Sequence, residues 1–267
     1  MAVAIVLVAL GYLMIRWRKR RGDGAKAEAP QGVAYPATWL MARQDTAENG
    51  LFDVPAESEE FEHVASRLVA DMRGPVGPGY GVRLLQLKRV QNDTLWRRYQ
   101  HEKAEIARRL GGGDGNEQLL WMSSGDTDPE RVAMNEHGFD ETYYAKKSYG
   151  SGAYFAKWPL YSHTLRPCSA ACFRAGQAGH LIILAQVALG DVKDYGSAYA
   201  NDLAREPDKP GGGQYDSWAG TEGDMQWCRG SVHKNALRAH GAQYGRQHIV
   251  RRYQKAYPQY ILQYQMT

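Results

Sequence analysis

The pattern of apolar and polar residues from Tyr35 onward predicts a mixed α/β body. Apolar residues at positions 61, 64, 68 and 72 repeat at helical spacing within ESEEFEHVASRLVADM, so a helix is expected after the acidic turn. A Pro/Gly loop over 74–81 separates this helix from a predicted strand, VRLLQLKRV. Asn92 and Asp93 then stand where a helix N-cap is expected, and three glycines at 111–113 end the predicted helix LWRRYQHEKAEIARRL.

The second half of the body is richer in strands. The stretch 119–165 predicts a strand, a polar loop, a short helix, a Gly-punctuated loop, a second strand and a helix start. A buried strand is expected over 180–192, and two short strands around 248–251 and 259–264 are separated by a predicted Tyr257-Pro258 turn. Consecutive strands with sparse helices disfavour a doubly wound parallel sheet. We therefore predict an α+β fold of split antiparallel or mixed sheets with flanking helices, which pack against one side.

The first residues differ from the body. Met1 to Ile15 is almost wholly apolar, and the basic run RWRKRR follows it at once, an order opposite to that of a secretory signal. At about 1.5 Å per residue the segment spans roughly 25 Å, the short end for a membrane helix. The division predicted is an N-terminal apolar helix with its basic flank as a membrane anchor (1–21), a Gly/Ala/Pro-rich tether (22–34) and the body (35–267). A buried or interfacial helix is the alternative to the anchor.

The basic flank also predicts location. The positive-inside rule places it, and the body after it, on the cytosolic side, as a single-pass membrane protein. The endoplasmic reticulum and the mitochondrial outer membrane both remain open as its site.

The net charge of +4 comes from the N-terminal segment. The first 30 residues hold six Lys/Arg and two acids, so the rest of the chain carries 27 bases and 27 acids. A neutral body shows no overall electrostatic footprint for nucleic acid, which is therefore not expected as a partner. A local patch of Arg246, Arg251 and Arg252 is the weaker alternative, as an RNA-binding face.

The cysteines Cys168, Cys172 and Cys228 are too few and too irregular for a disulfide framework. Cys168 and Cys172 can be combined with His163 and His180 into a zinc site, but the spacing matches no common pattern. Free thiols in a loop and no bound metal are the expectation.

Several segments carry a family resemblance in the same order along the chain. They are VQNDTLWRRY, LLWMSS with DPERV and HGFD, YGSGAYFA with Tyr161-Ser162, then VALGDV, YDS and KAYPQYILQY. From Tyr35 to its C-terminus the chain resembles the catalytic domain of the PARP-type, diphtheria-toxin-like ADP-ribosyltransferases. The resemblance implies a NAD-binding cleft between two antiparallel sheets, cleavage of the nicotinamide–ribose bond of NAD, and transfer of ADP-ribose to an acceptor.

The resemblance also implies site residues. Tyr154 matches the tyrosine that stacks on nicotinamide, and Ser162 matches the serine that bonds its carboxamide; an ordinary strand aromatic and a helix N-cap are the respective alternatives. The triad positions correspond to Met122, Tyr154 and Gln247. The positions expected to bind NAD are Ser123, Ser124, Gly152, Tyr154, Tyr161, Ser162 and Leu165.

Three of these positions depart from the family pattern. Met122-Ser123 stands where the family has His-Gly, and a thioether cannot replace the bond that an imidazole makes to a ribose hydroxyl. Leu165 replaces a second stacking aromatic residue. Gln247 stands where polymerases have Glu, although a one-residue slip would put His248 or Arg246 there.

Because glutamine is not a base, chain elongation is disfavoured. Two functions follow from these residues: a membrane-tethered mono-ADP-ribosyltransferase acting on protein acceptors, or an inactive relative that keeps the fold as a binding or scaffold module.

Overall fold

A computed structural model describes residues 32–43, 46–73, 81–125, 127–140, 147–165, 179–221 and 245–266. The chain forms two compact units, residues 1–34 and 35–267, and the second contains the elements discussed below. The predicted anchor, residues 22–31 of the predicted tether and all three cysteines lie outside the described residues. Within the described ranges, no helix combines the length and the apolar character that crossing a bilayer requires.

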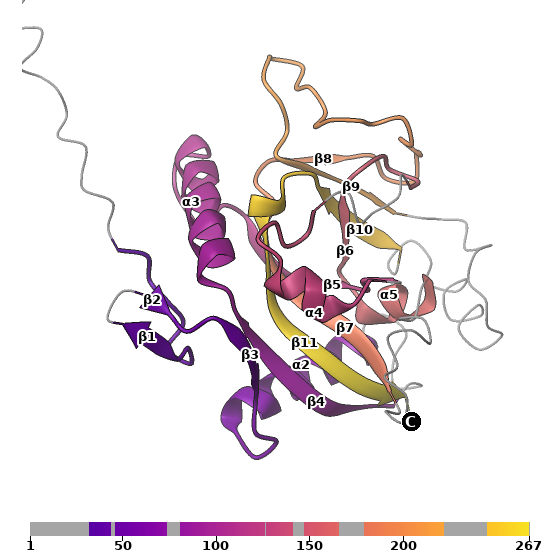
Figure 1. The fold of residues 1–267 in the computed structure, drawn as a ribbon. Helices are drawn as coiled ribbons and strands as arrows, with labels where there is room; N and C mark the ends of the chain where they lie inside the picture. The colour runs from indigo at the N-terminus through magenta and orange to yellow at the C-terminus, as the bar shows by residue number, and fades with distance from the viewer. Residues whose placement is uncertain are drawn as a thin grey trace, which may run out of the picture. The chain divides into compact units, whose positions relative to one another are not determined.

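The body is built on a nine-stranded sheet with the strand order β3-β4-β11-β7-β5-β6-β10-β9-β8 (Figure 1). Its strands are β3 (Gly50–Asp53), β4 (Val82–Gln91), β5 (Glu117–Met122), β6 (Ala153–Ala156), β7 (His180–Ala188), β8 (Val192–Asp194), β9 (Ser217–Thr221), β10 (Arg246–Val250) and β11 (Ala256–Met266). Neighbouring strands are antiparallel except for β8 and β9, which are parallel. A separate two-stranded sheet joins β1 (Met41–Arg43) to β2 (Thr46–Ala47). The predicted α+β class with a mixed sheet is confirmed.

The two halves of the large sheet meet between β5 and β6. These strands pair through Trp121 and Ala156, whereas β5 pairs with β7 from Glu117 to Met122. The predicted split into two sheets thus takes the form of one continuous sheet with a narrow junction. A single pair of residues therefore joins the two halves of the sheet, at the end of β5.

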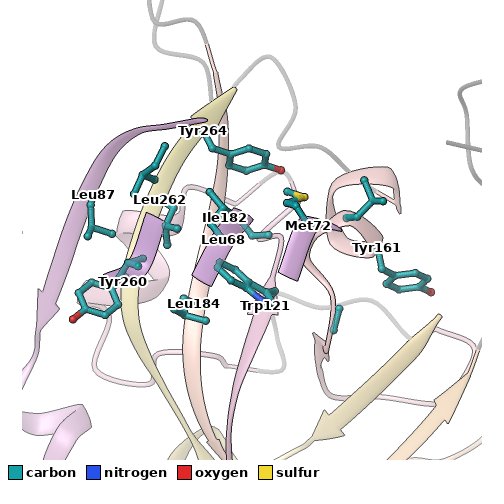
Figure 2. Close-up of a cluster of buried hydrophobic side chains, with 14 of the residues drawn as sticks. Leu68, Met72, Leu87, Trp121, Tyr161, Ile182, Leu184, Tyr260, Leu262 and Tyr264 are labelled. Atoms are coloured by element: carbon teal, nitrogen blue, oxygen red, sulfur yellow. The ribbon is translucent and has the colours of Figure 1, made fainter. Parts of the chain in front are cut away.

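Helices cover both faces of the sheet, so the expectation of helices against one side was wrong. On one face α2 (Glu59–Arg73) and α5 (Pro159–Leu165) pack over a cluster that includes Leu68, Met72 and Trp121 (Figure 2). On the other face α4 (Pro129–Met134) places Val132 against Leu120. Successive residues of β5 and β7 are apolar on both sides, and each side must be buried.

The helix α3 (Asp93–Arg109) begins as predicted. The N-cap is Asn92, whose Oδ1 accepts a hydrogen bond from the Leu95 amide at 3.2 Å. Trp96 in the first turn of the helix packs against Tyr257 of β11, with ring centroids 5.0 Å apart. The predicted helix from Phe61 corresponds to α2, and the predicted strand 82–90 corresponds to β4.

The C-terminal strands differ from the prediction. Pro258 lies inside β11, where the register with β7 shifts between Pro258 and Tyr260, and the chain turns earlier at the short 3₁₀ helix η4 (Tyr253–Lys255). The predicted Tyr257-Pro258 turn is therefore wrong. The Tyr257 side chain is fully buried and its hydroxyl donates to the carbonyl of Val90 at 2.9 Å, which holds this segment in the sheet, while the register shift accommodates a residue without an N–H.

Candidate functional site

The elements that carry several sequence-predicted site residues adjoin one another: β5 pairs with β6, β6 pairs with β10, and α5 contacts β5 and β6. β10 pairs with β6 so that Gln247 is opposite Ala156 and Ile249 is opposite Tyr154. Opposite residues of an antiparallel pair project to the same face, as do residues two apart on one strand. Tyr154 and Gln247 therefore lie on one face, in adjacent rows.

The same register places Gln247 and its two neighbours on different faces of the sheet. His248 is opposite Phe155 and projects to the other face, and Arg246 belongs with His248 because it is two residues away. Among the three positions considered from sequence, Gln247 alone shares a face with Tyr154. Its side chain is buried at 5% exposure.

Met122 ends β5 and lies in a different environment from Tyr154. Its side chain is 2% exposed and belongs to the apolar cluster that contains Val132 of α4, Phe139 and Phe155. Tyr154 belongs to a separate cluster with Tyr149, Trp218 and Ile249. The structure brings Met122 to the junction along the chain, but its side chain is packed as a core residue.

The serines around the junction have distinct positions. Ser162 Oγ donates to the carbonyl of Trp121 at 3.4 Å, so it lies directly beside the end of β5. It is inside α5, three residues after Pro159, and the alternative that it caps this helix is wrong. Ser123 accepts a hydrogen bond from the Gly125 amide at 3.4 Å, and Ser124 is buried at 7% exposure.

Two other predicted positions, Tyr161 and Gly152, are packed against neighbouring elements, and a third, Leu165, ends a helix. Tyr161 is 1% exposed and belongs to the apolar cluster that includes Leu68 and Met72 of α2 (Figure 2). Gly152 lies against β10: a Cβ there would be 2.6 Å from Ile249 Cγ2 and 2.9 Å from the Val250 carbonyl oxygen. Leu165 is the last residue of α5, and its side chain is outside the described part of the structure.

The Tyr154 hydroxyl holds the turn that precedes β6. It donates to the Gly150 carbonyl at 2.7 Å and accepts from the Tyr149 amide at 3.1 Å. The ammonium of Lys147 lies 4.7 Å from the centroid of the Tyr154 ring. The sequence carries no periodicity or spacing that marks Lys147, and it was not predicted as a site residue.

His248 is the most perturbed histidine among the described residues. Burial, then the charge of Arg246, lowers the pKa of His248 to about 4, with Asp194 opposing the shift. Its Nδ1 is buried without a hydrogen-bond partner among the residues that the structure describes. His248 is therefore neutral at physiological pH and faces away from the row of Gln247.

The zinc ligands considered from sequence are only partly described. The rings of His163 and His180 meet edge to face with centroids 4.5 Å apart, and His163 Nδ1 lies 2.8 Å from the Tyr264 hydroxyl. Cys168 and Cys172 lie outside the described residues. Across the described ranges no three His, Cys, Asp or Glu side chains form a metal-binding group.

A polar cavity of about 380 Å³ lies away from the junction, at the C-terminal end of α3. Charged residues of both signs line it, among them Arg109, Glu206, Asp216 and Lys255. The Lys255 side chain is 4% exposed and bonds the Asp216 carbonyl, and Arg109 pairs with the Asp216 carboxylate at 2.6 Å. These contacts fix the loop before β9, and sequence reasoning did not identify them.

The fold and the junction define the class of protein. A mixed sheet narrowed between β5 and β6, with Tyr154 and Gln247 on one face and Ser162 beside the end of β5, carries the ordered motifs of the ADP-ribosyltransferases. The sequence model of the family Poly(ADP-ribose) polymerase catalytic domain matches residues 58–266 of this chain. The chain therefore belongs to this family of NAD-dependent transferases.

Two curated relatives are similar to the same region. Protein mono-ADP-ribosyltransferase PARP12 of Mus musculus is 25% identical over 121 residues, which are 45% of this chain and 16% of the relative. Protein mono-ADP-ribosyltransferase PARP12 of Homo sapiens is 24% identical over 179 residues, 67% of this chain and 21% of the relative. The chain thus spans about a fifth or less of the length of these relatives.

Proposed function

We propose that this chain transfers single ADP-ribose units from NAD to protein acceptors. The observation that carries the proposal is the shared face of Tyr154 and Gln247, together with Ser162 beside the end of β5, the strand that pairs with β6. Both named relatives are described as protein mono-ADP-ribosyltransferases. In the reaction the bond between C1 of the ribose and the nicotinamide nitrogen breaks, nicotinamide leaves with that electron pair, and an acceptor oxygen, nitrogen or sulfur bonds C1 and loses a proton.

Each residue has a role that its chemistry permits. The ring of Tyr154 stacks on nicotinamide, and the Ser162 hydroxyl, buried at 7% exposure, bonds the carboxamide. The Gln247 amide donates to a hydroxyl of the nicotinamide ribose and stabilises its orientation as C1 becomes cationic. Glutamine cannot deprotonate a hydroxyl of a previously attached ADP-ribose, which supports single transfer over polymer formation.

Met122 lowers the expected rate. Its thioether makes no bond of useful strength to a ribose hydroxyl, and its side chain is buried among Val132, Phe139 and Phe155. One missing hydrogen bond of this kind costs about 1–3 kcal/mol, or roughly ten- to hundredfold in rate. The same packing favours a second candidate, an inactive domain that retains the fold for binding.

The test uses labelled NAD with the purified full-length chain and with Met122→His. We expect slow incorporation of a single ADP-ribose per site by the native chain and faster incorporation by the variant. Labelling by the native chain excludes the inactive domain. If the native chain is silent while the His variant labels protein, the transferase proposal is wrong and the inactive domain is correct. Thermal unfolding of Met122→His checks that its buried imidazole leaves the fold intact.

A paired comparison locates the site. Gln247→Ala is expected to reduce the thermal stabilisation that NAD produces, because it removes the ribose contact. Gln265→Ala is the matched control, since Gln265 is an exposed glutamine of β11. Equal NAD-induced stabilisation in both variants contradicts the role assigned to Gln247.

We also propose that the apolar segment Met1–Ile15 with its basic flank tethers the domain to a membrane, with the domain on the cytosolic side. The support is the sequence pattern, and the endoplasmic reticulum and the mitochondrial outer membrane are the two expected sites. Cell fractionation without detergent tests it. We expect the full-length protein to sediment with membranes and the variant without residues 1–21 to remain in the soluble fraction. Recovery of the full-length protein in the soluble fraction rejects the tether.

A further inference from the structure

A lysine side chain covers the ring that is proposed to stack on nicotinamide. Lys147 is exposed, and its Nζ lies 4.7 Å from the Tyr154 ring centroid, which is a cation–π distance. The Tyr154 side chain is almost fully covered, at 6% exposure. A planar ligand therefore cannot stack on this ring without moving a group that covers it.

The backbone that carries Lys147 is held firmly. Lys147 and Gly150 exchange backbone hydrogen bonds of 3.2 and 3.0 Å across a tight turn. The next residues are tied to the loop before β9 by bonds from the Ala200 amide to the Ser148 carbonyl and from the Ser151 amide to the Leu203 carbonyl, each 3.0 Å. The lysine thus reaches Tyr154 from a fixed position.

The opposite side of the turn is fixed as well. The Trp218 indole donates to the Tyr149 carbonyl at 2.7 Å. The Tyr149 ring lies so close to Gly220 of β9 that a Cβ at Gly220 would be 2.1 Å from it. These contacts leave the turn little freedom to carry Lys147 away from the ring.

The apolar groups of the Tyr154 cluster are buried or partly buried. Tyr149, Trp218 and Ile249 are fully buried, and Tyr195, Ala200 and Leu203 pack against the cluster as partly buried residues. Moving Trp218 or Ile249 would disrupt the packing of β9 and β10. Lys147, by contrast, is an exposed residue whose ammonium lies against the ring.

We propose that Lys147 competes with the cationic nicotinamide ring of NAD for the face of Tyr154, and so sets the affinity of this domain for NAD. The inference rests on the proposed function of Tyr154. The two competitors carry the same charge and use the same attraction to the negative face of an aromatic ring. When one occupies the face, the other meets both a steric and an electrostatic barrier.

The charge of the nicotinamide ring provides a specific test. NAD in its oxidised form carries a positive ring, whereas the reduced dinucleotide carries a neutral one of similar size. Removal of Lys147 is expected to raise affinity for the oxidised form about two- to fivefold, the equivalent of a solvent-accessible cation–π contact, and to raise affinity for the reduced form less.

The experiment is calorimetric titration of the full-length chain with both dinucleotides. Lys147→Ala removes bulk and charge, Lys147→Met removes charge but retains bulk over the ring, and Lys147→Arg retains both. For oxidised NAD, we expect Lys147→Ala to bind most tightly, Lys147→Met next and the native chain less tightly. Lys147→Arg is expected to bind as tightly as the native chain or less tightly. Lys157→Ala is the matched control, because Lys157 lies 5.2 Å from the ring of Trp158 instead.

The outcomes separate the two proposals. If the native chain binds NAD and Lys147→Ala binds it no better, the competition is refuted while the proposed function stands. An equal gain for the oxidised and reduced forms also refutes competition by charge. If neither the native chain nor any Lys147 variant binds NAD, the proposed function fails and this inference fails with it. Binding by Lys147→Ala alone supports both.

Discussion

We predict that the hydrogen bond between the buried Trp121 indole and α2 contributes measurably to the free energy of unfolding. Trp121 is fully buried, and its Nε1 donates to Asp71 Oδ2 of α2 at 2.8 Å. The same carboxylate accepts a hydrogen bond from Arg67 at 2.5 Å, and the Arg67 side chain is 40% exposed. Asp71 thus joins a buried donor to an exposed cation, and substitutions can remove the two contacts separately.

Asp71→Leu leaves the Trp121 N–H buried without an acceptor. Such a group costs about 1–3 kcal/mol, so the free energy of unfolding should fall by that amount. For a domain of this size, the midpoint of thermal unfolding should fall by roughly 2–4 °C per kcal/mol. Asp71→Asn keeps an acceptor for the indole and is expected to lose about 1 kcal/mol or less.

Arg67→Ala is the matched control, because it removes only the exposed partner of the same carboxylate. An exposed i,i+4 pair contributes about 0.3–0.5 kcal/mol, so this variant should unfold close to the native chain. Urea unfolding followed by tryptophan fluorescence measures all three variants. Equal stability of Asp71→Leu and Arg67→Ala would refute the reasoning, since it would mean that the buried indole bond contributes no more than the exposed ion pair.

Three further outcomes follow from the packing. Gly152→Ala should lose about 1–3 kcal/mol in urea unfolding because its Cβ would be 2.6 Å from a β10 side chain, whereas Gly211→Ala, with open space around it, should change little. His248 has a pKa of about 4 in the folded chain and an ordinary value when unfolded, so the unfolded state takes up the proton first and stability should fall as pH drops from about 6.5 to 4. His248→Asn should flatten that part of the stability–pH profile, and an unchanged slope would contradict the assignment. Lys255→Met should destabilise by about 3 kcal/mol because it breaks a buried ion-pair network, against less than about 1 kcal/mol for Arg205→Met at a surface pair; equal thermal shifts would count against it.

The sequence predicted the local elements well because their signals are local. The cap at Asn92 and the apolar repeat from Phe61 are set by neighbouring residues, and the corresponding helices begin where these signals lie. The ordered motifs also identified the family, which the match over residues 58–266 confirms. The Tyr257-Pro258 turn was wrong because a proline signal is local, whereas burial of Tyr257 against Val90 is a long-range contact.

The candidate site shows the same division. Sequence alone selected Tyr154, Ser162 and Gln247, and it predicted that Met122 stands where the family has a histidine. It left open whether Gln247 or a neighbour belongs to the site, and only the β6–β10 register places Gln247 on the face of Tyr154.

Other features depend entirely on tertiary structure. The packing of Met122 against α4 and the ammonium of Lys147 over Tyr154 result from which strands and turns the sheet brings together. Residue type and spacing determined the chemistry that this chain can offer. The strand order and register determined which of those groups share a face, because side-chain direction in a sheet is fixed by pairing between segments distant in the sequence.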